Sequence, residues 1–426
     1  MKKIAVIGGG ITGITTAYAL AKQGFAVTLF ERHRYAAMET SFANGGQLSA
    51  SNAEVWTHHS TILKGLKWML KSDAPLLVNP KPSWHKISWF AEFMASMKDY
   101  ERNTVETARL AVAARRHLFA WAHEERIDFD LKKQGILHIY RDKKGFDHAG
   151  KVSALLAKGG LPRQAVTPEE MKAIEPTLAG NYYGGYFTES DSTGDIHKFT
   201  TGLALAAQRL GVRTLYDQDV TSVSSDNQTA TIKVAHTDAP PTVHSFDGVV
   251  VCAGVASKQF AAQLGDRVNI YPVKGYSITV NLNDQDSQEG APQVSLLDDE
   301  TKLVTSRLGV DRFRVAGTAE FNGYNKDIRA DRIKPLIDWV QQCFPKINTR
   351  SVVSWAGLRP MMPNMMPKVG RGKAANVFYN TGHGHLGWTL SAVTADMVAD
   401  IVVQQMTGVN QTPKPQYKLG QLNPAK

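Results

Sequence analysis

The stretch Lys3-Ile-Ala-Val-Ile-Gly-Gly-Gly-Ile-Thr-Gly13, near the start of the chain, decides the fold. Its opening apolar run, Lys3–Ile7, is typical of a strand that is buried on both faces. A glycine turn follows, and the pattern beyond it predicts a helix over about Ile11–Lys22, a turn at Gly24 and a second strand over Ala26–Phe30. These elements form one βαβ unit, so the sequence predicts an α/β domain built on a parallel sheet.

The glycine turn matches the pattern G-x-G-x-x-G at Gly8, Gly10 and Gly13. In this pattern the glycines allow a tight turn, a close approach of the backbone to a pyrophosphate, and close packing of helix on strand. The helix N-terminus then offers free N–H groups to the phosphates. Glu31 ends the second strand 18 residues after Gly13, where an acidic side chain binds the hydroxyls of an adenosine ribose. The turn therefore predicts a dinucleotide site.

Composition narrows the class of protein without naming an activity. The chain has 426 residues, 43% apolar and 21% charged, which is ordinary for a globular protein of two domains. Its two cysteines, Cys252 and Cys343, show no CxxC spacing, so we expect neither a disulfide framework nor a cysteine-bound metal. The net charge of +10 suits nucleic acid, an anionic membrane surface or acidic small molecules as partners.

The start of the chain carries basic residues but no signal-peptide pattern, and no uninterrupted apolar run is long enough for a transmembrane helix. We therefore expect a cytoplasmic protein, either free in solution or peripheral on the cytoplasmic face of the inner membrane.

Further α/β elements follow later in the chain. A helix is predicted over Lys198–Leu210, and Asp247–Val251 and Val377–Asn380 are typical of apolar strands. The last strand leads into a glycine-rich loop, Gly382–Trp388, and then into an apolar helix. This loop is a second place where backbone dipoles are expected to meet a cofactor.

Four alternating stretches between these elements predict antiparallel strands with one solvated face. They are Ile136–Arg141, Tyr276–Leu282, Leu303–Leu308 and Phe313–Thr318. Because they interleave with the α/β elements, we expect two discontinuous domains. The dinucleotide-binding domain is predicted to comprise 1–55, 145–183, 195–270 and 345–426, and the second, mostly antiparallel domain 56–144, 184–194 and 271–344.

Several motifs, taken in this order, identify a family. The chain resembles the FAD-dependent amine and amino-acid oxidoreductases of the D-amino-acid oxidase and glycine oxidase superfamily, most closely the small-subunit type of bacterial D-amino-acid dehydrogenase. The resemblance covers nearly the whole chain. The matching motifs are Gly8–Gly13, Glu39-Thr-Ser-Phe-Ala-Asn-Gly-Gly-Gln47, Ser192-Thr-Gly-Asp195, Tyr271-Pro-Val-Lys-Gly-Tyr-Ser277, Gly357-Leu-Arg-Pro360 and Thr381-Gly-His-Gly-His-Leu-Gly-Trp388.

This resemblance implies a Rossmann-like FAD-binding domain of the glutathione-reductase type with a β-sheet substrate domain. It also implies FAD, held non-covalently because neither cysteine lies in a matching flavin loop. The segment Ser41–Leu48 would run beside the flavin, and the Gly382–Trp388 backbone would face its pyrimidine end. The implied FAD-binding residues are Gly8, Gly10, Ile11, Thr12, Gly13, Glu31, Arg32, Ser41, Asn44, Gly45, Gly46, Gln47, Leu48, Val220, Ala253, Gly254, Gly382, His383, Gly384, Leu386, Gly387 and Trp388.

For the substrate, related flavin oxidases use an arginine in the context of Arg359 to hold a carboxylate, which matches guanidinium geometry with two parallel hydrogen bonds. Tyr271 and Tyr276 are further candidates for substrate contact. The implied reaction is hydride transfer from Cα of a D-amino acid to flavin N5, followed by hydrolysis of the imino acid to a 2-oxo acid and ammonia. Such chemistry needs orientation and a dry pocket, so we expect no side-chain acid or base and no metal.

The segment 56–100 carries four of the eight tryptophans and six lysines against three acidic residues. Within Ser60–Lys71 the lysines and the apolar residues fall on different helical faces, which is typical of a helix at a membrane interface. A helix packed on the protein's own core has the same pattern, and both interpretations stay open. In the first, electrons would pass from the flavin to a membrane quinone or another respiratory acceptor.

Other functions fit part of the pattern. An oxygen-using oxidase of glycine, sarcosine or proline would carry most of the same motifs. An RNA-acting flavoprotein would explain the charge, but no RNA-binding module is recognisable, and we expect no nucleic-acid partner. A NAD-dependent dehydrogenase leaves Ser41–Leu48 and Gly382–Trp388 unexplained. A flavoprotein subunit without activity of its own also remains open.

Overall fold

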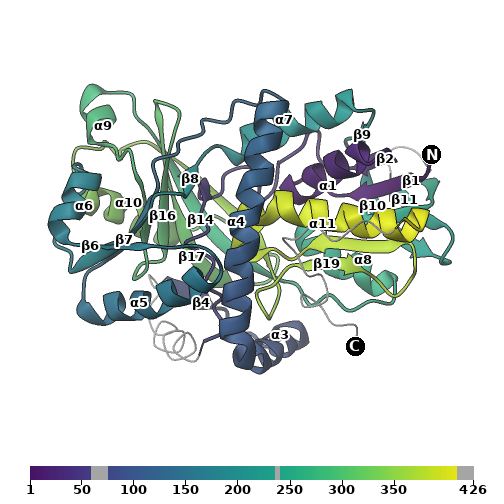
Figure 1. Cartoon of the computed structure of the whole chain (residues 1–426), viewed down its shortest axis with the longest axis horizontal. Coiled ribbons are helices and arrows are strands. Elements are labelled where there is room, and N and C mark those ends of the chain that lie inside the picture. Colours follow the sequence, from purple (N-terminus) through teal and green to yellow (C-terminus); the bar gives the residue numbers. More distant parts are fainter. Residues whose placement is uncertain (59–74, 236–239, 410–426) are drawn as a thin grey trace.

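The computed structural model describes residues 1–58, 75–235 and 240–409. Two large sheets lie side by side, with the long helix α4 (Tyr100–Glu124) running between them (Figure 1). The helix predicted within Ser60–Lys71 lies outside the described residues.

The first sheet is the predicted dinucleotide-binding sheet. Its strand order is β19-β20-β13-β1-β2-β9, parallel except at the β19–β20 edge. The opening βαβ unit has the bounds that the sequence predicts. The strands are β1 (Lys3–Ile7), β2 (Ala26–Phe30), β9 (Arg213–Leu215), β13 (Gly248–Val251), β19 (Lys368–Arg371) and β20 (Val377–Thr381).

Alternate side chains of β1 enter two different cores, because successive residues of a strand point to opposite faces. Ile4 and Val6 pack with the helices α1 (Ile11–Lys22), α7 (Ile196–Arg209) and α11 (Gly387–Thr407). Ala5 and Ile7 pack toward a small sheet and a short helix. These are β10 (Asp219–Ser225), β11 (Ala230–Ala235), β12 (Thr242–Phe246) and α8 (Ser257–Gln263).

Helix α7 begins at Ile196, two residues before the predicted start. The reason is Asp195, whose Oδ1 accepts hydrogen bonds from the backbone N–H groups of His197 (2.9 Å) and Lys198 (3.2 Å). Such an acceptor satisfies N–H groups that a helix start leaves free.

One helix of the described residues, Gly384–Thr407, is long and apolar enough to cross a membrane, and 78% of its most apolar window is buried inside the protein. It packs against α1 and α4 on the first sheet. Its apolarity is therefore that of a core helix, which is hydrophobic all round because protein surrounds it.

The second sheet has the order β18-β14-β17-β16-β15-β5-β7-β6, with β4 paired to β17. Its pairings are antiparallel except β15–β5 and β17–β4, so the mostly antiparallel prediction is confirmed. The strands are β4 (Leu76–Val78), β5 (Ile136–Tyr140), β6 (Gln164–Val166), β7 (Gly184–Thr188), β14 (Tyr271–Asn281), β15 (Ser295–Asp298), β16 (Leu303–Leu308), β17 (Arg312–Phe321) and β18 (Val352–Met361). A separate pair joins β3 (Gln47–Leu48) to β8 (Ser192–Thr193).

The predicted solvated face of this sheet is wrong, because all five residues of β5 are buried. Leu137 and Ile139 belong to the core that contains α10 (Ala330–Cys343). His138 and Tyr140 point to the other face, where they are buried and line a cavity. The alternating pattern of this strand therefore separates an apolar core from a polar cavity wall, and not a core from bulk solvent.

Two stretches assigned by sequence to the dinucleotide-binding domain lie with the second sheet instead. Within 145–183, β6 pairs with β7, and α5 (Lys143–Lys158) and α6 (Pro168–Ile174) pack on these strands. Strand β18 pairs with β14 along ten residue positions. Sheet pairing joins segments that are distant in sequence, so local patterns did not reveal these memberships. The remaining helices are α3 (Trp84–Ala95) and α9 (Gln285–Gly290).

Candidate active site

A cavity of about 1410 Å³ is lined by residues of both large sheets. Both sheets contribute to its walls, together with the segment after β2 and the loop before α11. Of the predicted site residues, all line this cavity except Gly13, Leu48 and Tyr271. The structure therefore brings together motifs that are as much as 380 residues apart in sequence, such as Gly8 and Trp388.

The glycine turn owes its shape to positions that tolerate no side chain. Gly8 has a φ of +107°, and a Cβ there would lie 2.6 Å from the carbonyl oxygen of Cys252. A Cβ on Gly13 would overlap the Gly8 carbonyl, so Gly13 serves the packing of α1 on β1 and does not line the cavity. The N–H of Ile11 donates to Oγ of Ser41 at 3.0 Å. The turn thus presents a bare backbone and a helix N-terminus, which suits a pyrophosphate.

Glu31 is held at the end of β2 by two backbone groups. Its Oε2 accepts from the N–H of Gly9 at 2.5 Å, and its Oε1 accepts from the N–H of His33 at 2.9 Å. The carboxylate is buried yet lines the cavity, and each oxygen keeps acceptor capacity. This arrangement fits the hydroxyls of a ribose. The neighbouring Arg32 turns its guanidinium to Glu39 at 2.5 Å.

The segment that follows β2 lies against strand β16. A Cβ on Gly45 would lie 2.5 Å from the Val304 side chain, and Gly46 has a φ of +72°. Gln47 donates through Nε2 to the carbonyls of Leu296 (2.9 Å) and Thr305 (3.1 Å). Lack of side chains at both glycines lets this segment form a thin wall of the cavity.

Several buried polar atoms of the cavity wall have no hydrogen-bond partner within the described part of the chain. Two of them, Oε1 of Gln47 and Nε1 of Trp388, belong to the segments expected beside the flavin. Buried polar groups without partners are rare and costly, so these atoms indicate a bound group that supplies an acceptor and a donor. An isoalloxazine ring carries both, and the residues present therefore fit a flavin.

The loop before α11 contributes backbone and two buried imidazoles. His383 contacts Thr394 Oγ1 at 2.9 Å, and burial lowers its pKa to about 3. His385 lies 3.3 Å from the carbonyl oxygen of Asn52 and stacks on Trp56. Burial lowers the pKa of His385 to about 4, so both rings are neutral near pH 7. In residues 1–58, 75–235 and 240–409, no cluster of His, Cys, Asp or Glu is placed to hold a metal ion.

Arg359 on β18 is a partly buried cation that faces the cavity. Its Nη1 donates to the Thr318 carbonyl at 2.8 Å and its Nη2 to the Gly317 carbonyl at 3.4 Å. Gly275 makes room for the guanidinium, since a Cβ there would overlap it. Among the described residues the guanidinium of Arg359 bonds backbone carbonyls and pairs with no carboxylate, and burial lowers its pKa to about 10. A desolvated cation without an anion favours an anionic ligand.

Thr318 adds a feature that the sequence did not reveal. It has a φ of +56°, which is a genuine outlier for a β-branched residue, and its buried Oγ1 has no partner among the described residues. Strained backbone of this kind concentrates at functional sites. No sequence pattern announces it, because the strain arises where β17 meets Arg359.

The two candidate tyrosines differ in position. Tyr276 lines the cavity, but its hydroxyl donates to Oε2 of Glu320 at 2.8 Å, in a buried group with Lys274. Tyr271 lies outside the cavity wall and stacks on Phe321 with ring centroids 5.5 Å apart. The structure therefore turns the Tyr276 hydroxyl away to a protein partner and does not bring Tyr271 to the site.

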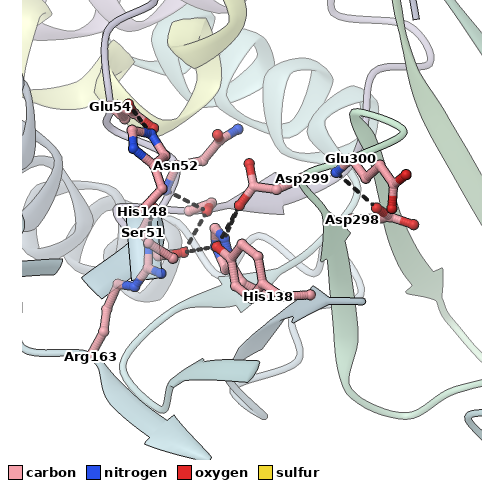
Figure 2. Close-up of polar contacts among 12 residues, drawn as sticks. Ser51, Asn52, Glu54, His138, His148, Arg163, Asp298, Asp299 and Glu300 are labelled. Carbon is pink, nitrogen blue, oxygen red and sulfur yellow. Dashed lines mark hydrogen bonds and ion pairs between the residues drawn. The ribbon is translucent and has the colours of Figure 1, made fainter. Parts of the chain in front are cut away.

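Sequence reasoning also missed a group of polar residues on one side of the cavity, which we call the polar wall (Figure 2). Its members come from separate segments, so no motif contains them. Ser51 Oγ contacts His138 Nε2 at 2.8 Å, and the hydroxyl of Tyr140 donates to Asp299 Oδ2 at 2.5 Å. The polar wall consists of Ser51, Glu54, His138, Tyr140, His148, Asp299 and Lys302.

Comparison with known proteins identifies the family. Residues 3–401 match the model of the FAD dependent oxidoreductase family. D-amino acid dehydrogenase 3 of Mesorhizobium japonicum is 60% identical over 406 residues, 95% of this chain and 98% of that protein. A D-amino acid dehydrogenase of Paramagnetospirillum magneticum is 40% identical over 411 residues, 94% of each chain. The chain belongs to the FAD-dependent oxidoreductases, and FAD is its cofactor.

Solved structures support the fold. Glycine oxidase from Geobacillus kaustophilus superposes with a TM-score of 0.75 at 21% identity, covering 97% of this chain and 98% of its own. L-proline dehydrogenase from P. horikoshii gives a TM-score of 0.72 at 18% identity, covering 97% and 95%. The predicted α/β class with a second, mostly antiparallel sheet is confirmed.

Proposed function

We propose that this enzyme oxidises D-amino acids to 2-oxo acids and ammonia, with the substrate carboxylate held by Arg359. The observation that carries the proposal is a guanidinium that faces the flavin cavity and has no anionic partner among the described residues. The relatives named D-amino acid dehydrogenase support the substrate class. Arg359 supplies two parallel donors, which match a carboxylate in geometry and charge.

Within this proposal the protein supplies orientation and a dry site. Bound FAD accepts the hydride that leaves Cα. The lone pair of the neutral amine forms the C=N bond and an N–H proton leaves, which gives the imino acid. A water molecule then hydrolyses the imino acid to ammonia and the 2-oxo acid. Holding the reacting groups in line is worth about 7–11 kcal/mol of barrier. Arg359 fixes the carboxylate, and the Gln47 and Trp388 side chains are proposed to fix the ring.

The proposal includes non-covalent FAD. Cys252 lies at the cavity edge near the glycine turn, but its Sγ contacts Thr16 Oγ1 at 3.6 Å. Burial raises the pKa of the Cys252 thiol to about 12, which disfavours the thiolate needed for a covalent link. Cys343 is buried outside the cavity wall.

A quinone or another respiratory acceptor, reached at an anionic membrane surface, completes the proposal. It is supported by α3 (Figure 1), which exposes Trp84, Ile87 and Met94 to 80%, 51% and 54%. Their spacing places them on one helical face, and the exposed Lys81 and Lys98 flank it. An apolar face with lysines suits an interface with anionic lipid. A cytoplasmic enzyme docked on the membrane is the proposed location.

The experiment that tests the substrate is anaerobic mixing of the purified yellow protein with matched D- and L-amino acids. We expect D-alanine to bleach the flavin absorbance and L-alanine to leave it unchanged. Bleaching by glycine, sarcosine or proline, with peroxide formed when air is the sole acceptor, would instead support an amine oxidase. Absence of bleaching by every D-amino acid would overturn the proposed function.

A further inference from the structure

The polar wall and the proposed carboxylate clamp, Arg359, line the same cavity. His385, which contacts Asn52, feels the positive charges of both Arg359 and Lys302, and each of them lowers its pKa after the larger effect of burial. Arg359, Lys302 and His385 all line the cavity, and both cations lie within electrostatic reach of this ring. When the carboxylate of a substrate is bound by Arg359, the side chain of that substrate can extend toward the polar wall.

Asp299 is a saturated member of the polar wall. Its Oδ1 pairs with Nζ of Lys302 at 2.9 Å, and its Oδ2 accepts from Tyr140 and lies 3.5 Å from Nδ1 of His138. His138 is in turn held by Ser51. The charge of Asp299 is therefore matched by the Lys302 cation, and its acceptor sites are occupied by protein groups. Figure 2 shows Asp299 beside His138.

Glu54 differs from Asp299 because one oxygen of its carboxylate has no partner among the residues that the structure describes. Its Oε1 accepts from the hydroxyl of Tyr100 at 2.6 Å and lies 3.5 Å from Nε2 of His148. Its Oε2 has no partner among the described residues, and the side chain, which lines the cavity, is 28% exposed. Burial acts to raise the pKa of Glu54, but the bonds from His148 and Tyr100 and the charge of Lys302 outweigh it and lower the pKa. Glu54 is therefore ionised near pH 7.

We propose that Glu54 is a specificity residue that selects D-amino acids whose side chain ends in a hydrogen-bond donor, an ammonium or a hydroxyl. This inference rests on the proposed function. A hydrogen-bond donor at the end of the substrate side chain would bond Oε2 of Glu54. An apolar side chain would instead displace solvent from this oxygen and leave it without a hydrogen-bond partner. A site built to bond a donor strongly rejects the analogue that lacks it.

The test uses two pairs of substrates of matched shape, with anaerobic flavin reduction as the readout. D-ornithine is compared with D-norleucine, and D-homoserine with D-norvaline, so that each pair differs by a donor in place of a methyl group. We expect the donor-bearing member to react with a kcat/KM at least about tenfold higher in one or both pairs. The pair that discriminates tells whether an ammonium or a hydroxyl is read.

Two variants assign this discrimination to Glu54. Glu54→Gln removes the charge but keeps a hydrogen-bond acceptor. The ratio of kcat/KM for D-ornithine to that for D-norleucine (the ornithine ratio) should therefore fall toward one, while the ratio for D-homoserine to D-norvaline (the homoserine ratio) should persist. Glu54→Leu removes both, so both ratios should fall toward one. Glu300→Gln is the control, because Glu300 is 69% exposed and paired with Arg141 at 3.8 Å, and it should leave both ratios unchanged.

Distinct outcomes overturn distinct claims. Flavin reduction by all four substrates at equal efficiency in the natural enzyme, or ratios that survive Glu54→Leu, would overturn the role of Glu54. A Glu54→Gln protein that slows all four substrates by the same factor would do so as well, since that result indicates a structural role. If none of the four D-amino acids reduces the flavin, the proposed function itself fails.

Discussion

Arg359 is the residue at which the proposed chemistry is most directly tested. Arg359→Lys keeps a positive charge but loses the planar fork, and Arg359→Ala loses both. Because a charged hydrogen-bond pair contributes about 1.5–3 kcal/mol, we expect kcat/KM for D-alanine to fall about tenfold to a hundredfold in Arg359→Lys and further in Arg359→Ala. Steady-state kinetics and flavin reduction measure this loss.

The control for Arg359 is Arg371→Lys, an exposed arginine on β19. It should retain full activity, and all three variants should bind FAD, because Arg359 reaches the cavity from the second sheet and not from the nucleotide turn. Full turnover by Arg359→Ala would contradict the carboxylate clamp.

Among the elements, helix α7 combines a cap with an ion pair at Asp195. The carboxylate accepts from two backbone N–H groups, and its Oδ2 pairs with Arg312 at 2.8 Å. Burial acts to raise the pKa of Asp195, but Arg312 and the backbone N–H groups outweigh it and lower the pKa. A folded-state pKa below the unfolded value means that stability is present above the unfolded pKa of about 4 and is lost as the pH falls through the folded pKa.

Asp195→Asn tests this link because asparagine caps a helix but carries no charge. We expect the free energy of unfolding to fall by about 1–3 kcal/mol at pH 7. The difference from the natural protein should shrink as the pH falls below about 4, where the carboxylate protonates in the unfolded chain. Denaturant unfolding at several pH values measures it. Asp311→Asn, an exposed contact of the same Arg312, should change stability by less than about 0.5 kcal/mol, and a pH-independent difference for Asp195→Asn would refute the link.

For the whole molecule, the exposed face of α3 predicts where the enzyme docks. The double substitution Trp84→Glu with Ile87→Glu removes apolar area and adds negative charge. We expect binding to vesicles of anionic lipid to weaken at least about tenfold and electron transfer to membrane quinone to slow with it. Vesicle flotation at increasing salt gives the measurement.

Val310→Glu is the matched control for α3, because Val310 is 77% exposed but lies outside that helix. It should bind vesicles as the natural protein does, and activity with a soluble dye acceptor should be the same in all three proteins. Vesicle binding that is unaffected by the α3 substitutions would contradict the membrane role of this helix.

Local sequence determined the opening βαβ unit to the residue, because strand burial, the glycine turn and the helix period all act over short distances. Most of the residues predicted to bind FAD line the cavity for the same reason, since the nucleotide turn and the proposed flavin loops are continuous motifs. The ion pair of Asp195 with Arg312 was not predictable in this way, because the two residues are 117 positions apart in sequence.

Only the tertiary structure decided how the proposed substrate residues are arranged around the cavity. Sheet pairing brought Arg359 to Thr318 and turned the Tyr276 hydroxyl to Glu320, and it moved β18 and residues 145–183 to the second sheet. The polar wall gathers side chains from segments that share no pattern. Pairing between strands that are distant in sequence determines which side chains face a cavity. Local sequence patterns do not show which strands pair, so they could not predict this arrangement.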